Sequence, residues 1–595
     1  MKKKMIRTIS IIVITLFVII GNSFANITES DKEILRAMED EISRSMDQLY
    51  LESLERPYYI EYKLVVEEPV VIGATLGSIR DFSESKRARL YVQVRVGDYK
   101  FDNTNFFDFG LSLFGSGDDE ERFAGRQISY ELDYNSLRRN FWLATDAAYK
   151  QSAEILSKKQ AAIKNRIRKD TTHDYLMIDP EKHFDSEEFV KIDVDKYKQL
   201  IKEISKVFVK FPEVTVSSVG FEFIPEKVYY LNSEGRQYIR TDHYTGLEIV
   251  CFTQAEDGMP LADMFTSIVK QPNELPTKDS LLSAAKYVAY GLTALKSAPY
   301  LEESYSGPII FEGQAAAEVF AMVFAPNLVT QRPPMTEGGM QESDRYMAFQ
   351  SKIGGRVLPE FFDVWAEPSL TKYKKTPLIG NFNIDDEGVL AQKVELVRDG
   401  YLKNLLSTRT PTKRVRESNG HNRGGAAMLS VINISSDEEH TKSDSDLKKR
   451  LLELCNDREL PFGIVVRKIL DQNILFTSLF RVTGGSFPMV QIQTKLPVIE
   501  AYKVFPDGRE ELIRGAQAYR FTTQSFKDII LTGSDKYALN YLAPAVSSPF
   551  VTGGKQYLGT SIITPNILFE DGEINIFEDD FPKPPLYPGP RSAGK

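Results

Sequence analysis

The chain has 595 residues, of which 42% are hydrophobic and 26% charged, a composition typical of globular proteins. Its formal net charge of −9 argues against nucleic acids and anionic membrane surfaces as partners, because both repel an acidic protein. Two cysteines, Cys251 and Cys455, are too few for a disulfide scaffold; they form either one bridge or two separate buried thiols. The length predicts about two to four domains.

The first 25 residues have the pattern of a cleavable export signal. Four basic residues precede an apolar run from Ile9 to Ile20, too short to span a bilayer, and small residues follow at Ser23 and Ala25. Cleavage after Ala25 removes four positive charges and takes the formal charge from −9 to −13. No later run approaches the ~20 apolar residues of a spanning helix, so we expect a periplasmic or secreted protein without stable membrane insertion. An uncleaved membrane anchor is the alternative.

Helices and antiparallel strands are predicted to alternate in the amino-terminal part. Helical periodicity predicts helices over 30–46, 137–164 and 197–211. Alternation of apolar residues predicts strands over 58–66 and 90–96 and an antiparallel meander over 214–254. We expect a capping box between Ser30 and Glu33 at the first helix start, a helix end at Pro212, and a turn at Asn232–Gly235.

The carboxy-terminal part is predicted to be rich in short strands. A helix over 280–297, a strand over 307–311 and a helix over 313–325 come first, and later helices are expected only after Asp444 and near 524–531. The predicted fold class is α+β, with helices and antiparallel strands in the amino-terminal domain and a mixed β-sheet in the carboxy-terminal one. The predicted domains are a signal peptide 1–25, an amino-terminal α+β domain 26–257, a linker 258–278, a carboxy-terminal β-rich domain 279–577 and a flexible tail 578–595.

Long, ordered phrases of this part resemble one known family. They are "DDEG" at 385–388, "VELVRDGYLKNLLSTRTPTKRVRESNGHNRGG", "KVFPDGREELIRG" and "SIITPNILFEDGEI". In this order they resemble the carboxy-terminal half of the TldD/PmbA family of metallopeptidase-related proteins, strongly over 307–574 and fairly over 214–253. The resemblance implies dimers that enclose a chamber, with cleavage of unfolded peptides by a zinc-binding subunit.

The zinc ligands of the family are missing at the matching places. The zinc-binding member holds its metal with two histidines of an HExxxH helix and a late cysteine, whereas this chain reads "FEGQAAAEVF" and, for the cysteine segment, "YLAPAVSSPFVTGG". The resemblance places Phe311 and Ala316 at the histidine positions and Glu312 at the general base. No cofactor is therefore expected, and the chain resembles the metal-free TldE (PmbA) branch. Glu312 is a weak catalytic candidate, and a carboxylate favoured by a helix start is the simpler interpretation.

The glycine-rich loop "RESNGHNRGG" is the second candidate region. Ser418 and His421 could form a nucleophile–base pair, but no G-x-S-x-G elbow is present, and a loop kept flexible by glycines is the simpler interpretation. A third interpretation gives the loop donors for a peptide or a partner. The residues assigned to this contact are Arg409, Lys413, Ser418, His421 and Arg423. We expect these side chains to be exposed. Replacing any one of them should therefore change the free energy of unfolding by no more than ~0.5 kcal/mol.

An acidic run, Asp385, Asp386 and Glu387, stands before Gly388. Such carboxylates could bind calcium or act as an acid–base pair, but the EF-hand spacing is absent. The expected structure is a solvated turn with one or two capping carboxylates.

Three functions are compatible with the sequence. The first is a non-catalytic subunit that supports a TldD-like zinc-binding partner in peptide proteolysis, and a homodimer is the alternative assembly. The second is a peptide-binding or chaperone-like module without cleavage. The third is a hydrolase with unrecognised catalytic residues such as Glu312 or His421. Each would take a peptide or unfolded protein, which strand edges can capture by β-augmentation.

Overall fold

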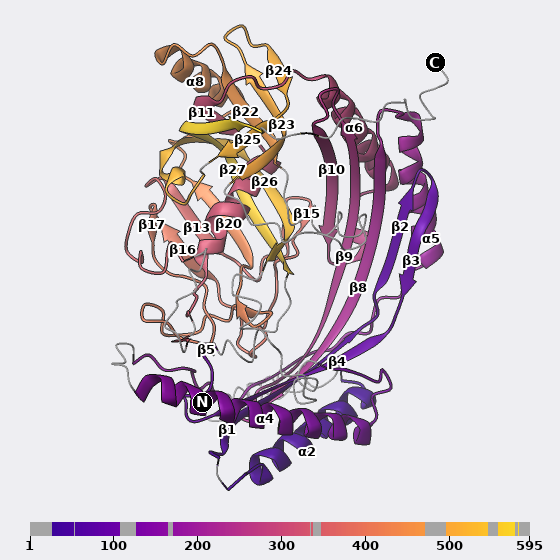
Figure 1. Cartoon of the computed structure of the whole chain (residues 1–595), viewed down its shortest axis with the longest axis vertical. Helices are drawn as coiled ribbons and strands as arrows, with labels where there is room; N and C mark the ends of the chain where they lie inside the picture. Colours follow the sequence, from indigo (N-terminus) through magenta and orange to yellow (C-terminus); the bar gives the residue numbers. More distant parts are fainter. Residues whose placement is uncertain are drawn as a thin grey trace, which may run out of the picture.

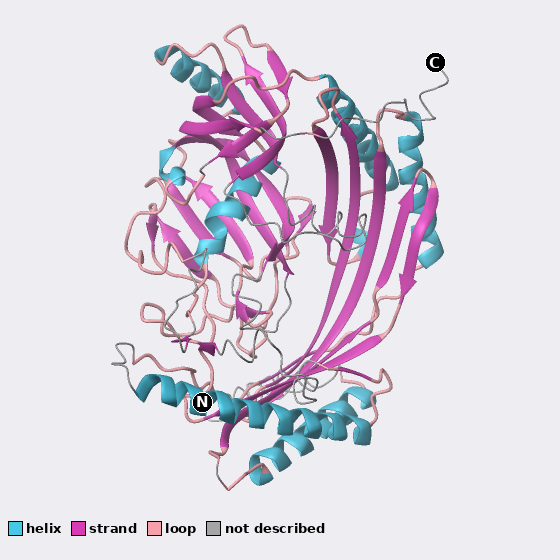
Figure 2. Ribbon diagram, viewed as in Figure 1, coloured by secondary structure: helices cyan, strands magenta, loops and turns pink. Residues whose placement is uncertain are grey.

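The computed structural model describes residues 27–52, 54–107, 126–164, 171–333, 335–336, 347–469, 495–519, 521–544, 557–577 and 581. The predicted signal peptide and all of the predicted tail except Phe581 lie outside these residues. Within the described ranges, no helix is both long and apolar enough to cross a membrane. Two large sheets organise the chain, and helices pack on both, which confirms the α+β class (Figures 1 and 2).

The first sheet has nine described strands and curves like half of a barrel (Figure 1). The strands are β1 (Pro57–Glu67), β2 (Val70–Thr75), β3 (Ser78–Glu84), β4 (Arg87–Val96), β6 (Gln127–Ile128), β7 (Lys182–Asp185), β8 (Val216–Asn232), β9 (Gln237–Gln254) and β10 (Pro260–Val269). The main strand order of the sheet is β10–β9–β8–β1–β4–β6; β2 pairs with β8 and β3, and β7 pairs with β9. Every described strand pair except β7–β9 is antiparallel. The predicted meander is confirmed, but its short segments are fused into the two long strands β8 and β9, joined at the predicted turn, where Gly235 has φ +91°.

Four helices cover the convex face of this sheet (Figure 2). They are α2 (Glu29–Gln48), α4 (Tyr134–Lys164), α5 (Val194–Ser205) and α6 (Lys278–Ser297). Apolar side chains on alternate positions of each strand meet them; Tyr62 of β1, for example, stacks on Phe141 of α4 with ring centroids 4.5 Å apart. The opposite, concave face carries Tyr59, Glu61 and Lys63 and turns toward the second sheet.

Two local predictions in this part were wrong. The first helix begins two residues earlier than expected: Thr28, not Ser30, caps α2. Its hydroxyl accepts from the Asp31 N–H at 3.1 Å, and the Asp31 carboxylate accepts from the Thr28 N–H. The predicted linker 258–278 contains β10, whose ten residues all pair with β9. Proline at position 260 misled the prediction, because proline is tolerated at the first residue of an edge strand.

Helix α6 belongs to the first sheet, not to the second part as predicted. Its buried face, including Leu281, Val288 and Leu292, packs with residues of β9 and β10 in one apolar cluster. The first sheet and its helices therefore extend to Ser297, beyond the predicted boundary at 257.

The second sheet is mixed and has twelve described strands. The strands are β11 (Tyr305–Phe311), β13 (Phe362–Ala366), β16 (Val394–Arg398), β17 (Tyr401–Leu402), β20 (Val431–Ser436), β21 (Thr441–Lys442), β22 (Gly463–Ile469), β23 (Lys495–Val504), β24 (Glu510–Ile513), β25 (Ala516–Tyr519), β26 (Ile529–Pro544) and β27 (Tyr557–Ile576). The long strand β27 pairs with β11, β20, β25 and β26, so that β11, β22, β23, β25 and β27 close into a ring. This ring and its neighbours enclose the largest apolar cluster of the described residues.

Short elements complete the fold. The helix predicted after Asp444 is confirmed as α8 (Asp444–Asp457), which lies on β11 and β22. Helix α7 (Gln314–Val319) continues into a π-helical turn at Phe320–Phe324, within the predicted helix 313–325. The predicted helix near 524–531 is wrong: a short 3₁₀ turn, Ser525–Asp528, leads directly into β26. Paired two-residue strands are β5 (Phe106–Phe107) with β12 (Met335–Thr336), β14 (Lys372–Tyr373) with β15 (Thr376–Pro377), and β18 (Asn422–Arg423) with β19 (Ala426–Ala427).

Candidate functional site

The strand–helix junction between β11 and α7 holds the residues aligned with a zinc-binding helix. Phe311, the last residue of β11, is fully buried, and its ring meets the rings of Phe521 and Phe569 edge-on at centroid distances of 5.4 and 5.5 Å. Ala316 of α7 is fully buried in the same apolar cluster. Both positions are therefore part of the core of the second sheet.

Glu312 is held by two cations. Arg467 Nε donates to Glu312 Oε2 at 2.9 Å, and Lys448 Nζ lies 3.6 Å from Oε1. The same two cations also bind Glu510, at 2.7 and 2.8 Å. This network of two cations and two carboxylates gives Glu312, two residues before α7, a structural role.

The glycine-rich loop does not contain a nucleophile–base pair. His421 is fully buried; its Nδ1 lies 2.9 Å from the carbonyl oxygen of Asn419, and its Nε2 lies 3.2 Å from the hydroxyl of Ser430. Ser418 Oγ instead accepts from the backbone N–H of Gly420 at 3.3 Å. Gly420 has φ +73°, and a Cβ there would collide with the backbone of Leu390, so this glycine permits close packing rather than flexibility.

Burial of the imidazole lowers the pKa of His421 from 6.5 to about 4. The depressed pKa in the folded state means that this group's contribution to stability is complete above 6.5 and is lost as the pH falls through 4. We expect the ring signals of His421 to show no protonation between pH 7 and pH 5 in an NMR titration, with a histidine-containing reference peptide as control. A midpoint near 6.5 would contradict the buried, neutral imidazole.

The basic residues assigned to peptide or partner contact do not form one surface. Arg409 is fully buried, Arg423 is half-buried, and Lys413 is exposed. Arg423 Nη1 donates to the carbonyl oxygens of Leu429 and Gly559 at 3.1 and 2.8 Å, and burial lowers the pKa of this guanidinium to about 10. The expectation of exposed side chains was therefore wrong for Arg409 and His421.

Arg409 reaches across to the first sheet. Its Nη2 donates to both carboxylate oxygens of Glu234 at 2.7 and 2.6 Å, and its Nε donates to the carbonyl oxygen of Leu176 at 2.9 Å. The guanidinium also lies over the ring of Tyr175, 4.0 Å from the centroid. Arg409 thus links the loop that carries it to the part of the chain that contains the first sheet. Local sequence gave no indication of this role.

The acidic turn, residues 385–388, is buried against the first sheet rather than solvated as predicted. Asp385 is 0% exposed and Glu387 is 7% exposed. Asp385 accepts hydrogen bonds from the backbone N–H groups of Glu387, Val389 and Asn422 at 3.0, 2.8 and 3.0 Å. The prediction failed because acidic composition indicates a surface turn, whereas donors distant in sequence allow burial.

Basic side chains of the first sheet hold this acidic turn. Arg236 Nη1 donates to the carbonyl oxygen of Gly388 at 2.7 Å. Arg240 Nη1 donates to the carbonyl oxygen of Ile384 at 3.1 Å, and its Nη2 donates to Asp386 Oδ1 at 3.1 Å. The acidic turn is therefore fixed to the concave face of the first sheet.

Comparison with known proteins places the chain in a family. A family model described as the PmbA/TldA metallopeptidase C-terminal domain matches residues 304–472. A metalloprotease of Archaeoglobus fulgidus is 30% identical over 111 residues, which are 18% of this chain and 24% of that protein, so the match spans about a quarter of the relative's length. The chain carries a domain of the TldD/PmbA family.

Solved structures share the fold of this TldD/PmbA protein. TldE from Thermococcus kodakarensis is 13% identical, with a TM-score of 0.55 over 91% of this chain and 100% of that one. A candidate modulator of DNA gyrase from Thermotoga maritima is also 13% identical, with a TM-score of 0.56 over 91% and 99% of the two chains. At this identity the likeness shows the fold alone.

The residues present at the β11–α7 junction of this TldD/PmbA chain do not fit a zinc ion. Zinc requires imidazole, thiolate or carboxylate ligands, and Phe311 and Ala316 supply none. Over the described ranges, no group of three or more histidine, cysteine or acidic side chains is arranged to hold a metal. Cys251 and Cys455 are separate, buried free thiols. No catalytic step through a metal follows from this geometry.

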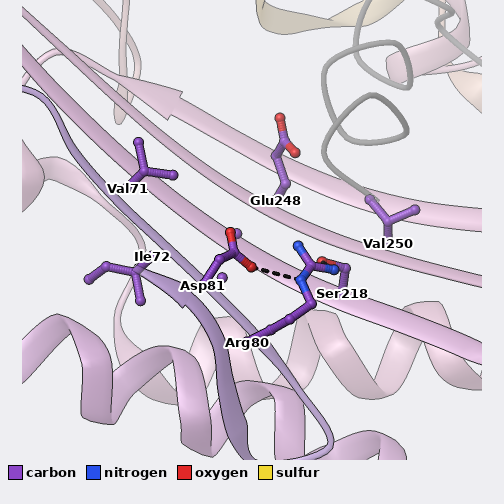
Figure 3. A pocket seen from close by; sticks show the side chains of 9 residues that line it. Val71, Ile72, Arg80, Asp81, Ser218, Glu248 and Val250 are labelled. Atoms are coloured by element: carbon purple, nitrogen blue, oxygen red, sulfur yellow. Dashed lines mark hydrogen bonds and ion pairs between the residues drawn. The ribbon is translucent and has the colours of Figure 1, made fainter. Parts of the chain in front are cut away.

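A shallow recess lies on the concave face, between β2, β3, β8 and β9 (Figure 3). It encloses about 310 Å³ of empty space, open solvent included. Arg80 Nε donates to Asp81 Oδ1 at 2.7 Å within it, and Arg80 Nη1 lies 3.4 Å from the hydroxyl of Ser218 (Figure 3). Because Arg80 is already paired with Asp81, the recess offers a polar wall rather than an unsatisfied charge.

Proposed function

We propose that this chain is an exported, non-catalytic TldE-like subunit that supports a zinc-binding TldD-like partner in peptide proteolysis. The proposal rests on the identity and burial of two side chains at the β11–α7 junction. Phe311 and Ala316 stand where the family's zinc-binding member has histidines, and both are buried in the apolar core. A metal site could not be restored there by a change of rotamer, because neither side chain has a donor atom.

The state of Glu312 supports the same proposal. A general base must be able to take a proton from a water or a nucleophile within hydrogen-bond reach. The Glu312 carboxylate is instead bound to Arg467 and lies beside Lys448, so its oxygens are engaged in ion pairs within the chain. The chain's role is then to shape the chamber wall with the concave face of its first sheet and to present that wall to an extended peptide.

The test is purification of the tagged full-length protein from the envelope of its native cell. We expect it to copurify with a second protein that carries an HExxxH motif, and zinc to be stoichiometric with that partner. We also expect the complex to cleave an unfolded peptide in a chelator-sensitive manner, and the isolated chain to leave the peptide intact. Terminal sequencing of the same sample should find Asn26 as the first residue.

Three results would contradict the proposal. Stoichiometric zinc on the isolated chain after dialysis would show a metal site formed by other ligands. Chelator-resistant cleavage by the isolated chain would favour a hydrolase with unrecognised catalytic residues. Tight peptide binding by the isolated chain, without any metalloprotein partner in the native cell, would favour a chaperone-like module.

A further inference from the structure

Three carboxylates at the contact between the two sheets form no ion pair with any cation in the described part of the chain. They are Glu61 of β1 and Asp385 and Glu387 of the acidic turn. Glu61 Oε2 accepts from the hydroxyls of Tyr59 and Tyr230 at 2.7 and 3.1 Å. Glu387 Oε2 accepts from the backbone N–H of Arg409 at 2.8 Å, and Asp385 accepts only backbone N–H groups. Uncharged donors therefore carry all their hydrogen bonds.

The cations around these three carboxylates are bound to other acids. The ion pairs are Arg409–Glu234 at 2.6 Å, Arg95–Asp102 at 3.0 Å, Arg240–Asp386 at 3.1 Å, Lys63–Asp386 at 3.6 Å and Arg236–Glu181 at 2.5 Å. The remaining titratable groups that face the cluster are the buried phenols of Tyr59, Tyr175, Tyr230 and Tyr238. Each of these five cations is thus already paired with another acid, and no cation is left to pair with Glu61, Asp385 or Glu387 among the ion pairs of the described residues.

Two neighbouring carboxylates in such a site do not both ionise easily, because burial and mutual repulsion each disfavour the second charge. Burial raises the pKa of Asp385, and the charge of Glu387 raises it further, against the opposing N–H groups of Val389 and Asn422. Burial also raises the pKa of Glu387, against the opposing charge of Arg409. Burial outweighs these opposing groups at both side chains, so the pKa of each carboxyl lies above its usual value.

We propose that the acidic turn is a proton-operated latch between the two sheets: a proton held by Asp385 or by Glu387 closes it, and loss of that proton loosens it. In the closed state the turn sits on the concave face under Arg236 and Arg240. When both carboxylates are charged, their repulsion favours release of the turn toward water. Glu61 adds a third negative charge on the side of the first sheet.

The direction of the pH effect follows from linkage. A carboxyl group with a raised pKa in the closed state contributes stability that is complete below its pKa in the open state and is lost as the pH rises through the closed-state pKa. A difference of one bound proton changes the closing equilibrium by at most about tenfold per pH unit. The latch therefore opens toward alkaline pH, opposite to the acid release expected of ordinary ion pairs.

Hydrogen exchange of the full-length protein between pH 5 and pH 8 tests the latch, with rates corrected for the intrinsic pH dependence of exchange. Peptides covering 384–392 and 228–240 report on the two sides of the contact, and a peptide from α2 serves as an internal reference. In the wild type we expect protection of both peptides to fall as the pH rises, by up to about tenfold per unit. In Glu387→Gln, which removes the charge that repels the Asp385 carboxylate, the protection should be nearly independent of pH.

Asp386→Asn is the matched control, because it removes a carboxylate of the same turn that is bound to Arg240 and Lys63. It should lower protection at every pH and keep the wild-type slope. Protection that is flat or rises with pH in the wild type would overturn the proposal, and so would a wild-type slope in Glu387→Gln. If that variant does not fold, Asp385→Asn provides the same comparison.

Discussion

Replacing Arg409 with methionine is expected to lower the free energy of unfolding by about 3–5 kcal/mol, the usual cost of breaking a buried ion pair. The guanidinium has no exposed surface, and its partner Glu234 is 8% exposed in its side chain. Methionine fills much of the same volume but leaves the Glu234 carboxylate and the carbonyl oxygen of Leu176 without these donors. Chemical denaturation of wild type and variant at neutral pH measures the difference.

Two further variants separate the ion pair from general effects on the loop. Lys413→Met changes an exposed cation four residues away and should cost no more than ~0.5 kcal/mol. The double variant Arg409→Met with Glu234→Gln removes both charges and should regain part of the loss, because no buried charge is left unpaired. Equal losses in Arg409→Met and Lys413→Met would show that the buried pair is not the cause.

Elements fixed by local periodicity could be predicted from the sequence. The helix over 137–164 was expected to begin at Leu137 and is found at Tyr134–Lys164, because its apolar positions repeat at helical spacing over several turns. The strand β4 alternates apolar and polar residues without interruption; it ends at the predicted residue, Val96, and begins at Arg87, three residues before the predicted start. In both elements the information lies within the element itself.

Elements fixed by pairing with distant strands could not be predicted. Pro225 lies inside β8, where a proline usually interrupts a strand, but β9 continues the pairing on both sides of it. The residues of β10 resembled a linker because proline and polar residues flank a short apolar alternation. Only the neighbouring strand β9, on one edge, and α6, on the convex face, make this segment a strand of the first sheet.

The role of the basic loop was also out of reach of local sequence. Arg409 is 175 residues from Glu234 and 233 residues from Leu176 in the chain, so no spacing rule could pair them. One signal was available: β1 carries Tyr59, Glu61 and Lys63 opposite its apolar face, and tyrosines at a polar strand face often mark a contact rather than a solvated surface. The positions that the resemblance aligns with zinc ligands, by contrast, lie in an ordered motif and could be located from it.

A second buried ion pair joins the two sheets at β22 and β10. Lys468 Nζ donates to Asp263 Oδ1 at 2.8 Å and to the carbonyl oxygen of Met264 at 3.1 Å, and both side chains are less than 10% exposed. Asn540 Nδ2 donates to the carbonyl oxygen of Ile268 at 2.8 Å. These donors occupy carbonyl groups of the edge strand β10 that would otherwise be open to pairing with another chain.

Lys468→Met is expected to lower the free energy of unfolding by about 3–5 kcal/mol at pH 7.5, because it leaves the Asp263 carboxylate buried without its cation. Burial already raises the pKa of Asp263 in the wild type, against the opposing charge of Lys468, and loss of the lysine raises it further. A raised pKa in the folded state gives stability that is present at low pH and lost as the pH rises. The cost of Lys468→Met should therefore be smaller at pH 5 than at pH 7.5, as measured by chemical denaturation at both values.

The matched control is the half-exposed ion pair between Asp257 and Arg514, which joins the same two sheets at 2.7 Å. Asp257→Asn should cost no more than about 1 kcal/mol, because solvent screens an exposed pair. Adding Asp263→Asn to Lys468→Met should recover most of the loss at pH 7.5 and abolish its pH dependence, since no buried carboxylate remains to be charged. A cost of Lys468→Met that is the same at both pH values, and unchanged by Asp263→Asn, would mean that the methylene stem of Lys468 stabilises this contact by packing, and that its charge does not.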